Sequence, residues 1–154
     1  MKTERTGVRV LGRSFPFFKR VNSIGDEGVI KQIFANKDYE VEMWAQGQAL
    51  RRYFNCLLSK KRVPIIIDAG ANIGASSLFF SASYEGSHVL AIEPDPENCV
   101  LLTRNVIDMN VSVVQAGLTS IIGDLFLQDP GWSDWGFRTS KDPEINGRVV
   151  PATT

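Results

Sequence analysis

The spacing of hydrophobic residues divides the chain into a first part with helical periods and a second part in which strands and helices alternate. Between residues 46 and 61, apolar side chains recur three and four positions apart, which predicts an amphipathic helix. Residues 25–34 begin with two acidic side chains, as a helix N-terminus favours, and predict a shorter helix. Residues 38–43 alternate polar and apolar side chains, which predicts a half-buried strand. In residues 1–24 no period is sustained, and we expect an extended or irregular segment whose aromatic side chains pack on the domain.

From residue 63 onwards, the pattern predicts three strands separated by two helices: strands at 65–67, 88–92 and 111–116, and helices at 74–84 and 96–109. The first strand is a β-branched run, which indicates a strand buried on both faces. Helical crossovers of this length join parallel strands, and ligands bind at the carboxyl ends of such strands. We therefore expect an α/β fold. We expect residues 63–154 to form part of a Rossmann-like, doubly wound parallel sheet, and residues 1–62 to form a basic, mainly helical extension that packs on it.

The helical period stops beyond residue 117, where we expect strands at 124–128 and 147–150 and a turn at 129–131. In a sheet of this kind, the next two parallel strands lie on one side of the strand at 65–67, so its other edge lacks a partner. We expect either a partner chain that completes the sheet at this edge or a chain that is the N-terminal portion of a longer protein.

Composition and charge exclude several classes of protein. A chain of 154 residues with 44% hydrophobic and 22% charged residues predicts one compact soluble domain. The net charge of zero removes a whole-chain argument for nucleic acid or an anionic membrane, although residues 1–62 hold 13 of the 17 basic side chains. A basic group there offers one alternative function, binding of an anionic polymer, against the more common interpretation of a solvated helix face: Arg51, Arg52, Lys60, Lys61 and Arg62.

No transmembrane segment or signal peptide is predicted, and the two cysteines fit a reducing compartment. We expect Cys56 and Cys99 to be buried thiols in the cytoplasm. Neither has a second cysteine or a histidine at the spacing of metal ligands, so no metal site is predicted.

The strongest chemical signal is a glycine-rich turn, residues 68–74, between the first predicted strand and its helix. Gly70 permits a tight turn and close approach of a ligand, and Gly74 permits close packing where the helix begins. The pattern acidic-x-G-x-x-x-G differs from the G-x-G-x-x-G of dinucleotide sites, which ranks a nicotinamide-dependent reductase last. It resembles the first motif of Rossmann-like S-adenosylmethionine-dependent methyltransferases. Backbone N–H groups and Asp68 suit the carboxylate and ammonium of the methionine end, and a turn without a ligand is the alternative.

A second signal is Glu93, which ends the second predicted strand 19 residues after Gly74. A carboxylate at this place can accept both ribose hydroxyls. Asp95 fits the N-cap of the next helix, with Pro96 at its first position, and we also expect Asp95 beside the adenosine.

The residues of the acceptor side are less clearly marked. Asp134 and Trp135, in the loop after the third strand, are candidates for contact with the acceptor, with ordinary loop packing as an equal alternative. His88 precedes a strand on the side away from the crevice, so a surface position is favoured over a general base. No catalytic residue is predicted.

Several stretches together resemble the FkbM-type methyltransferases: residues 66–74, 91–98 and 102–105, extended by 113–118 and 135–138. The likeness covers about residues 25–152. It implies a class I methyltransferase fold and transfer of a methyl group from S-adenosylmethionine to a hydroxyl oxygen of a saccharide or another small molecule. Family members continue into a fourth parallel strand, so the resemblance also implies that this chain corresponds to their N-terminal portion. A non-catalytic cofactor-binding or interaction module is the alternative.

The same resemblance assigns cofactor contacts to three segments of the chain. It implies that the methionine end is held by the glycine-rich turn, the ribose by Glu93 and the adenine edge by residues 115–117. The residues concerned are Asp68, Gly70, Ala71, Asn72 and Gly74 for the turn, and Gln115, Ala116 and Gly117 for the adenine edge.

Overall fold

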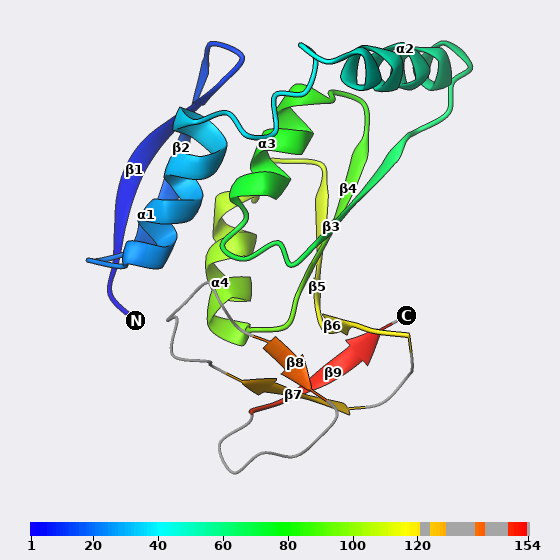
Figure 1. Ribbon diagram of the computed structural model, residues 1–154. Coiled ribbons are helices and arrows are strands. Elements are labelled where there is room, and N and C mark those ends of the chain that lie inside the picture. The colour runs from blue at the N-terminus through cyan, green and yellow to red at the C-terminus, as the bar shows by residue number, and fades with distance from the viewer. Residues whose placement is uncertain (121–123, 129–137, 141–147, 154) are drawn as a thin grey trace.

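The computed structural model describes residues 1–120, 124–128, 138–140 and 148–153, and its chain begins with a β-hairpin (Figure 1). Strands β1 (Thr3–Val10) and β2 (Arg13–Arg20) pair antiparallel. The two turn residues, Leu11 and Gly12, both have positive φ, as the tight turns that match the twist of a hairpin require.

This hairpin adds regular structure to a segment for which the sequence predicts only extended or irregular backbone. Gly7 and Pro16 face each other across the two strands. They interrupt the alternation of polar and apolar residues by which a strand is predicted from sequence. The expected packing of the aromatic side chains is confirmed, because Phe17 is fully buried and Phe15 and Phe18 pack against the core.

The predicted helices of the first part are present. Helix α1 (Ile24–Ile30) continues into a π-helical turn, η1 (Lys31–Ala35), and the longer helix α2 (Ala45–Ser59) follows. The strand predicted at residues 38–43 is wrong. The segment instead forms turns, in which the amide of Trp44 donates to the carbonyl of Val41 at 3.0 Å. This backbone hydrogen bond is made within the segment and not to a neighbouring strand.

The alternation of strands and helices is confirmed in the second part. Strands β3 (Ile65–Ala69), β4 (His88–Glu93) and β5 (Val111–Gln115) form a parallel sheet in the order β3-β4-β5. Helix α3 (Ala75–Ser83) connects the first pair and helix α4 (Pro96–Asn105) the second.

The elements stack in three layers (Figure 1). Helices α3 and α4 lie between the sheet on one side and the hairpin with α1 on the other, so the first 35 residues contribute to the same core. That core contains fully buried side chains from all three layers: Phe17, Leu78, Leu101, Leu102 and Ala91. Both connecting helices cover the same face of the sheet, and the doubly wound arrangement stays a prediction.

Strand β3 lies at the edge of the sheet, and the expectation that it is buried on both faces is wrong. Ile65 is 68% exposed and Ile67 62% exposed, because α3 and α4 cover only the opposite face. As expected, the next two strands lie on one side of it, and within the described ranges no strand pairs with its other edge. An apolar groove of about 430 Å³ runs beside it, with Leu50 and Tyr53 of α2 in its wall. The partner chain expected at this edge stays a prediction.

A second small sheet lies at the carboxyl end of β5 (Figure 1). Its order is β6 (Gly117–Leu118), β9 (Arg148–Thr153), β7 (Asp124–Gln128) and β8 (Arg138–Ser140). The strands predicted at 124–128 and 147–150 are confirmed as β7 and β9. The turn predicted at 129–131 lies outside the described residues. No helix in the described part of the chain combines the length and apolar character needed to cross a bilayer.

Candidate functional site

The glycine-rich turn after β3 is held against the end of β4. The amides of Gly70 and Ala71 both donate to the carbonyl of Ile92, at 2.9 and 3.1 Å. Gly70 has a φ of 79° and Asn72 a φ of 50°, so the chain reverses through left-handed conformations. A Cβ added to Gly70 would meet no atom within 4 Å, which leaves its outer side open to a ligand.

Gly74 matches the close-packing role that the sequence predicts for it. It precedes α3 with a φ of 89°, and a Cβ there would lie 2.7 Å from Cδ1 and 3.2 Å from Cα of Leu102. Only a residue without a side chain lets α3 and α4 approach this closely at the site.

Glu93 joins the turn to the next helix. Its side chain is 5% exposed, and Oε2 accepts a hydrogen bond from the amide of Asn72 at 2.8 Å. Oε1 accepts from the amide of Asp95 at 3.0 Å and from Nδ2 of Asn98 at 3.1 Å. Since a carboxylate offers about four acceptor positions, these three bonds leave room for about one ribose hydroxyl.

The protonation of Glu93 reflects two opposing effects. Burial raises the pKa of its carboxyl group, and the hydrogen bonds from Asn98, Asp95 and Asn72 act in the opposite direction. The charge of Asp95 adds to the upward shift.

Asp95 caps α4, as the sequence predicts. Its Oδ1 accepts from the amides of Glu97 and Asn98, both at 2.9 Å, and Pro96 occupies the first position of the helix. Oδ2 pairs with Arg148 of β9 at 3.1 Å, which brings the second sheet to the edge of the site.

Asp68 holds the first turn of α3. The hydroxyls of Ser76 and Ser77 donate to its Oδ2 at 2.7 and 2.5 Å, so one of its oxygens is already engaged. The charge of Asp68 also acts on Tyr39, whose ring stacks on Phe80. The pKa of the Tyr39 hydroxyl is raised, first by burial and then by the charges of Asp68 and Asp38. Asp68 thus shapes the turn from within, and its contact with a ligand stays a prediction.

The predicted adenine-side residues lie beside Glu93. Gln115 pairs with Glu93 in the register of β4 and β5, and the amide of Ala116 donates to the carbonyl of Glu93 at 3.1 Å. Gly117 is buried directly after them. The three strand ends therefore bring the predicted cofactor residues together, from the turn at 68–74 to residues 115–117.

Other candidates lie away from these strand ends. His88 begins β4 at the far end of the sheet, where its Nδ1 lies 3.0 Å from Oδ1 of Asn110. Asp134 and Trp135 lie outside the described residues. Among the residues with described positions, no group of three potential ligands is arranged to hold a metal ion.

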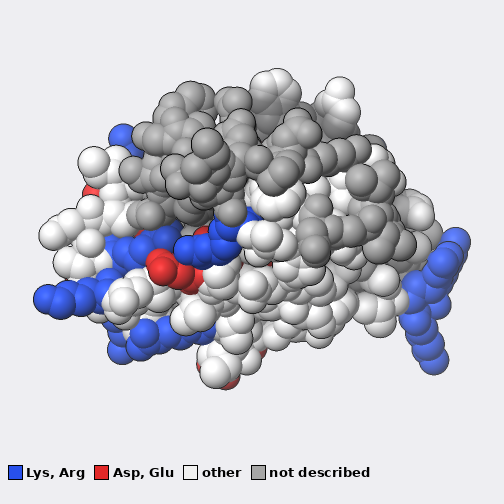
Figure 2. Space-filling view, turned by 90° about the horizontal axis from the view of Figure 1, so that it is seen from below, with Lys and Arg blue, Asp and Glu red and all other residues white. Residues whose placement is uncertain are grey.

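The expected basic group, which lies on α2 and directly after it, is partly engaged within the fold. Arg51 pairs with Glu42, donates to the carbonyl of Ser83 at 2.9 Å and lies 4.0 Å from the ring centre of Tyr84. On the side of the molecule where the strands end, basic side chains gather at two opposite margins, with acidic side chains against one group (Figure 2). Binding of an anionic polymer stays a prediction.

The expectation that both cysteines are buried is wrong for one of them. Cys56 is exposed because α2 packs through one face only, whereas Cys99 is buried and its thiol donates to the carbonyl of Glu93 at 3.2 Å. Burial raises the pKa of the Cys99 thiol to about 12, so this group stays protonated beside the site.

Asn98 is a site residue that the sequence reasoning missed. It is buried on α4 together with Leu101, Leu102 and Asn105, at intervals of three, four and seven residues. An asparagine in the core-facing stripe of a helix needs hydrogen-bond partners, and this placement is the signal that could have revealed it.

Comparisons with known proteins point to methyltransferases. A protein from Sordaria araneosa, named Methyltransferase sdnD, is 41% identical over 66 residues, which cover 40% of this chain and 26% of the relative. A protein from Beauveria bassiana (strain ARSEF 2860), named Methyltransferase 1, is 33% identical over 90 residues, which cover 58% of this chain and 30% of the relative. The matched parts thus span less than a third of either relative. No family model matches the chain, and no solved structure matches it.

Proposed function

We propose that this chain is an S-adenosylmethionine-dependent methyltransferase of the FkbM type, with a Rossmann-like class I fold, that methylates a hydroxyl oxygen of a saccharide or another small molecule. One observation carries the proposal. The buried carboxylate of Glu93 accepts the amide of Asn72 at 2.8 Å, so the acid predicted to bind the ribose and a glycine-rich turn meet at the ends of two parallel strands. The two relatives named methyltransferases support it.

The residues present fit this cofactor. The open outer side of Gly70 admits the methionine end against the backbone, and Asp68 lies at the base of the same turn. The remaining acceptor position of Glu93 suits a ribose hydroxyl, and residues 115–117 border the place for the adenine. The cofactor supplies an electrophilic methyl group.

In this proposal, the chain contributes binding and orientation. Methyl transfer is an in-line displacement, so holding the methyl donor and the acceptor in line supplies much of the rate. A general base for the acceptor hydroxyl is not assigned. The free thiols Cys56 and Cys99 support a reducing, cytoplasmic setting as part of the proposal.

Calorimetric titration of the 154-residue chain with S-adenosylmethionine tests the proposal. We expect saturable binding, and stabilisation by about 2.7 kcal/mol when the ligand stands at about 100 times its dissociation constant. NAD⁺ serves as the comparison ligand, because the turn lacks the spacing of a pyrophosphate cradle. Binding of NAD⁺ in preference to S-adenosylmethionine, or of neither, would contradict the proposed function.

A further inference from the structure

A buried ion pair joins the N-terminal hairpin to α1. Asp26 is completely buried and Arg20 is 9% exposed. Nη2 of Arg20 lies 2.6 Å from Oδ1 of Asp26, and Nε lies 3.1 Å from Oδ2. The amide of Arg20 also donates to Asp26 at 2.7 Å, and Ser23 accepts the amide of Asp26 at 3.1 Å. The guanidinium is thereby fixed at the end of β2.

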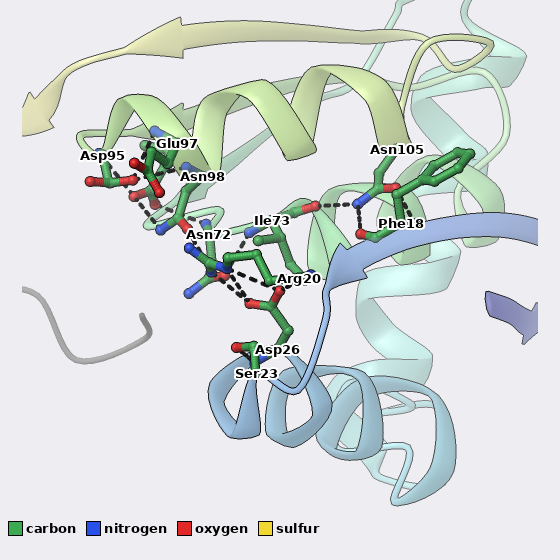
Figure 3. Close-up of polar contacts among 11 residues, drawn as sticks. Phe18, Arg20, Ser23, Asp26, Asn72, Ile73, Asp95, Glu97, Asn98 and Asn105 are labelled. Atoms are coloured by element: carbon green, nitrogen blue, oxygen red, sulfur yellow. Dashed lines mark hydrogen bonds and ion pairs between the residues drawn. The ribbon is translucent and has the colours of Figure 1, made fainter. Parts of the chain in front are cut away.

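From this position Arg20 reaches the candidate cofactor site. Its Nη2 also donates to Oδ1 of Asn98 at 3.0 Å (Figure 3). Nδ2 of the same Asn98 donates to Oε1 of Glu93 at 3.1 Å. A guanidinium only donates and a carboxylate only accepts, so one orientation of the Asn98 amide satisfies both neighbours. Arg20 therefore favours the orientation of Asn98 in which the N–H side of its amide faces Glu93.

We propose that Arg20, held by Asp26, is a positioning residue for cofactor binding that acts through Asn98 on Glu93; this inference rests on the proposed role of Glu93 in binding the ribose. Asn98 directs its N–H to Oε1, which the amide of Asp95 also contacts. The other oxygen, Oε2, then faces the turn beside Asn72, where the proposed function places the ribose.

Stability alone is a weak explanation for the Arg20–Asp26 pair. Moving two charges out of water costs about as much as their attraction returns, and apolar replacements of buried pairs are often neutral or stabilising. A direct link to the site gives the pair a role that an apolar replacement cannot fill. It also couples the extension in residues 1–62 to the site at the strand ends.

If Arg20 positions Asn98 against Glu93, the pKa of Glu93 reports this role directly. The titratable or charged groups around it are Asp95, with its partner Arg148, Cys99, and the Arg20–Asp26 pair behind Asn98. The hydrogen bond from Asn98 favours the carboxylate, so losing or misdirecting this donor raises the pKa of Glu93 further. A role confined to overall stability would leave that pKa in place.

Three variants and a matched control separate these possibilities. Asn98→Leu removes the donor, and the double variant Arg20→Met with Asp26→Asn removes the ion pair without leaving a buried charge. Arg20→Lys is the milder change, because a single ammonium keeps Asp26 but lacks the planar fork that also reaches Asn98. The control is Lys19→Met with Glu27→Gln, which removes the ion pairs of Lys19 with Glu27 of α1, at 3.0 Å, and with Glu4 of β1, without touching Asn98.

The measurements are the pKa of Glu93, from the ¹³C shift of its carboxyl group, and the dissociation constant for S-adenosylmethionine. We expect Asn98→Leu to raise that pKa and weaken binding roughly tenfold, the size of one hydrogen bond to a charged group. The Arg20 variants should act in the same direction, and the ion-pair variant should add nothing in the Asn98→Leu background. The control should leave both quantities unchanged.

The outcomes distinguish this inference from the proposed function. An unchanged Glu93 pKa in folded Arg20 variants, or a fully additive effect with Asn98→Leu, would overturn the positioning role. If the pKa shifts as expected while the unaltered chain does not bind S-adenosylmethionine, the connection holds and the proposed function fails, and with it the role in cofactor binding. Should the double variant fail to fold, Arg20→Lys decides between the same outcomes.

Discussion

Replacing Glu93 by alanine is expected to weaken S-adenosylmethionine binding at least tenfold. The change removes the acceptor for the ribose, and a hydrogen bond to a charged group contributes about 1.5–3 kcal/mol. It also leaves three donors without their acceptor, those of Asn72, Asp95 and Asn98, so the free energy of unfolding should fall by about 2–4 kcal/mol. Titration calorimetry and urea unfolding measure the two effects separately.

Glu97→Ala provides the matched control for this variant. It removes the same charge four residues later, from an exposed position in the first turn of α4. We expect an unchanged dissociation constant and a loss of stability below about 1 kcal/mol, from the helix dipole alone. Equal effects of the two variants on binding would remove Glu93 from the site.

The binding should also depend on pH through Glu93. The carboxylate form accepts the ribose hydroxyl, and burial raises the pKa of this group. Affinity is therefore expected to fall as the pH decreases through the raised pKa, above the range in which an exposed glutamate titrates.

Replacing Gly74 by alanine is expected to cost about 2–5 kcal/mol of unfolding free energy. A left-handed φ costs a residue with a side chain about 1–2 kcal/mol. The added Cβ would lie 2.7 Å from Cδ1 and 3.2 Å from Cα of Leu102, and overpacking of this kind typically costs about 1–3 kcal/mol more. The side-chain atom can move aside, but the backbone atom moves only with α4.

Gly70→Ala isolates the conformational part of this cost. Gly70 also has a left-handed φ, of 79°, but a Cβ there would meet nothing within 4 Å. Its stability loss should stay near about 1–2 kcal/mol in the same urea titration. Equal losses for the two glycines would show that the contact between α3 and α4 is not tight at Gly74.

The sequence predicts the parallel unit well because its signals are local. Short β-branched runs, glycine turns and helical periods mark β3, α3, β4 and β5 nearly to their ends. They also mark the start of α4, although this helix ends at Asn105 and not at residue 109. The turn at Gly70 and Gly74 is predictable for the same reason, since a strand, a tight reversal and a helix follow one another directly. The cap at Asp95 also follows from neighbouring residues alone.

The rest depends on contacts that no local pattern encodes. Whether Ile65 and Ile67 are buried depends on what covers the second face of the sheet, and a β-branched run has the same sequence in either case. The sequence does not predict the hairpin, because Gly7 and Pro16, which face each other across its strands, interrupt the alternation of polar and apolar residues. The role of Asn98 depends on Arg20, which is 78 residues away in the sequence.

The central claim is that S-adenosylmethionine binds where β3, β4 and β5 end, and amide chemical-shift mapping tests it most directly. In a ¹H–¹⁵N NMR titration of the chain with S-adenosylmethionine, we expect the perturbed amides to cluster at residues 70–74, 93–95 and 115–117. The amides of the β1–β2 turn, Leu11 and Gly12, should stay unchanged. Shifts concentrated instead at the apolar groove beside α2, or no saturable shifts at all, would contradict the account.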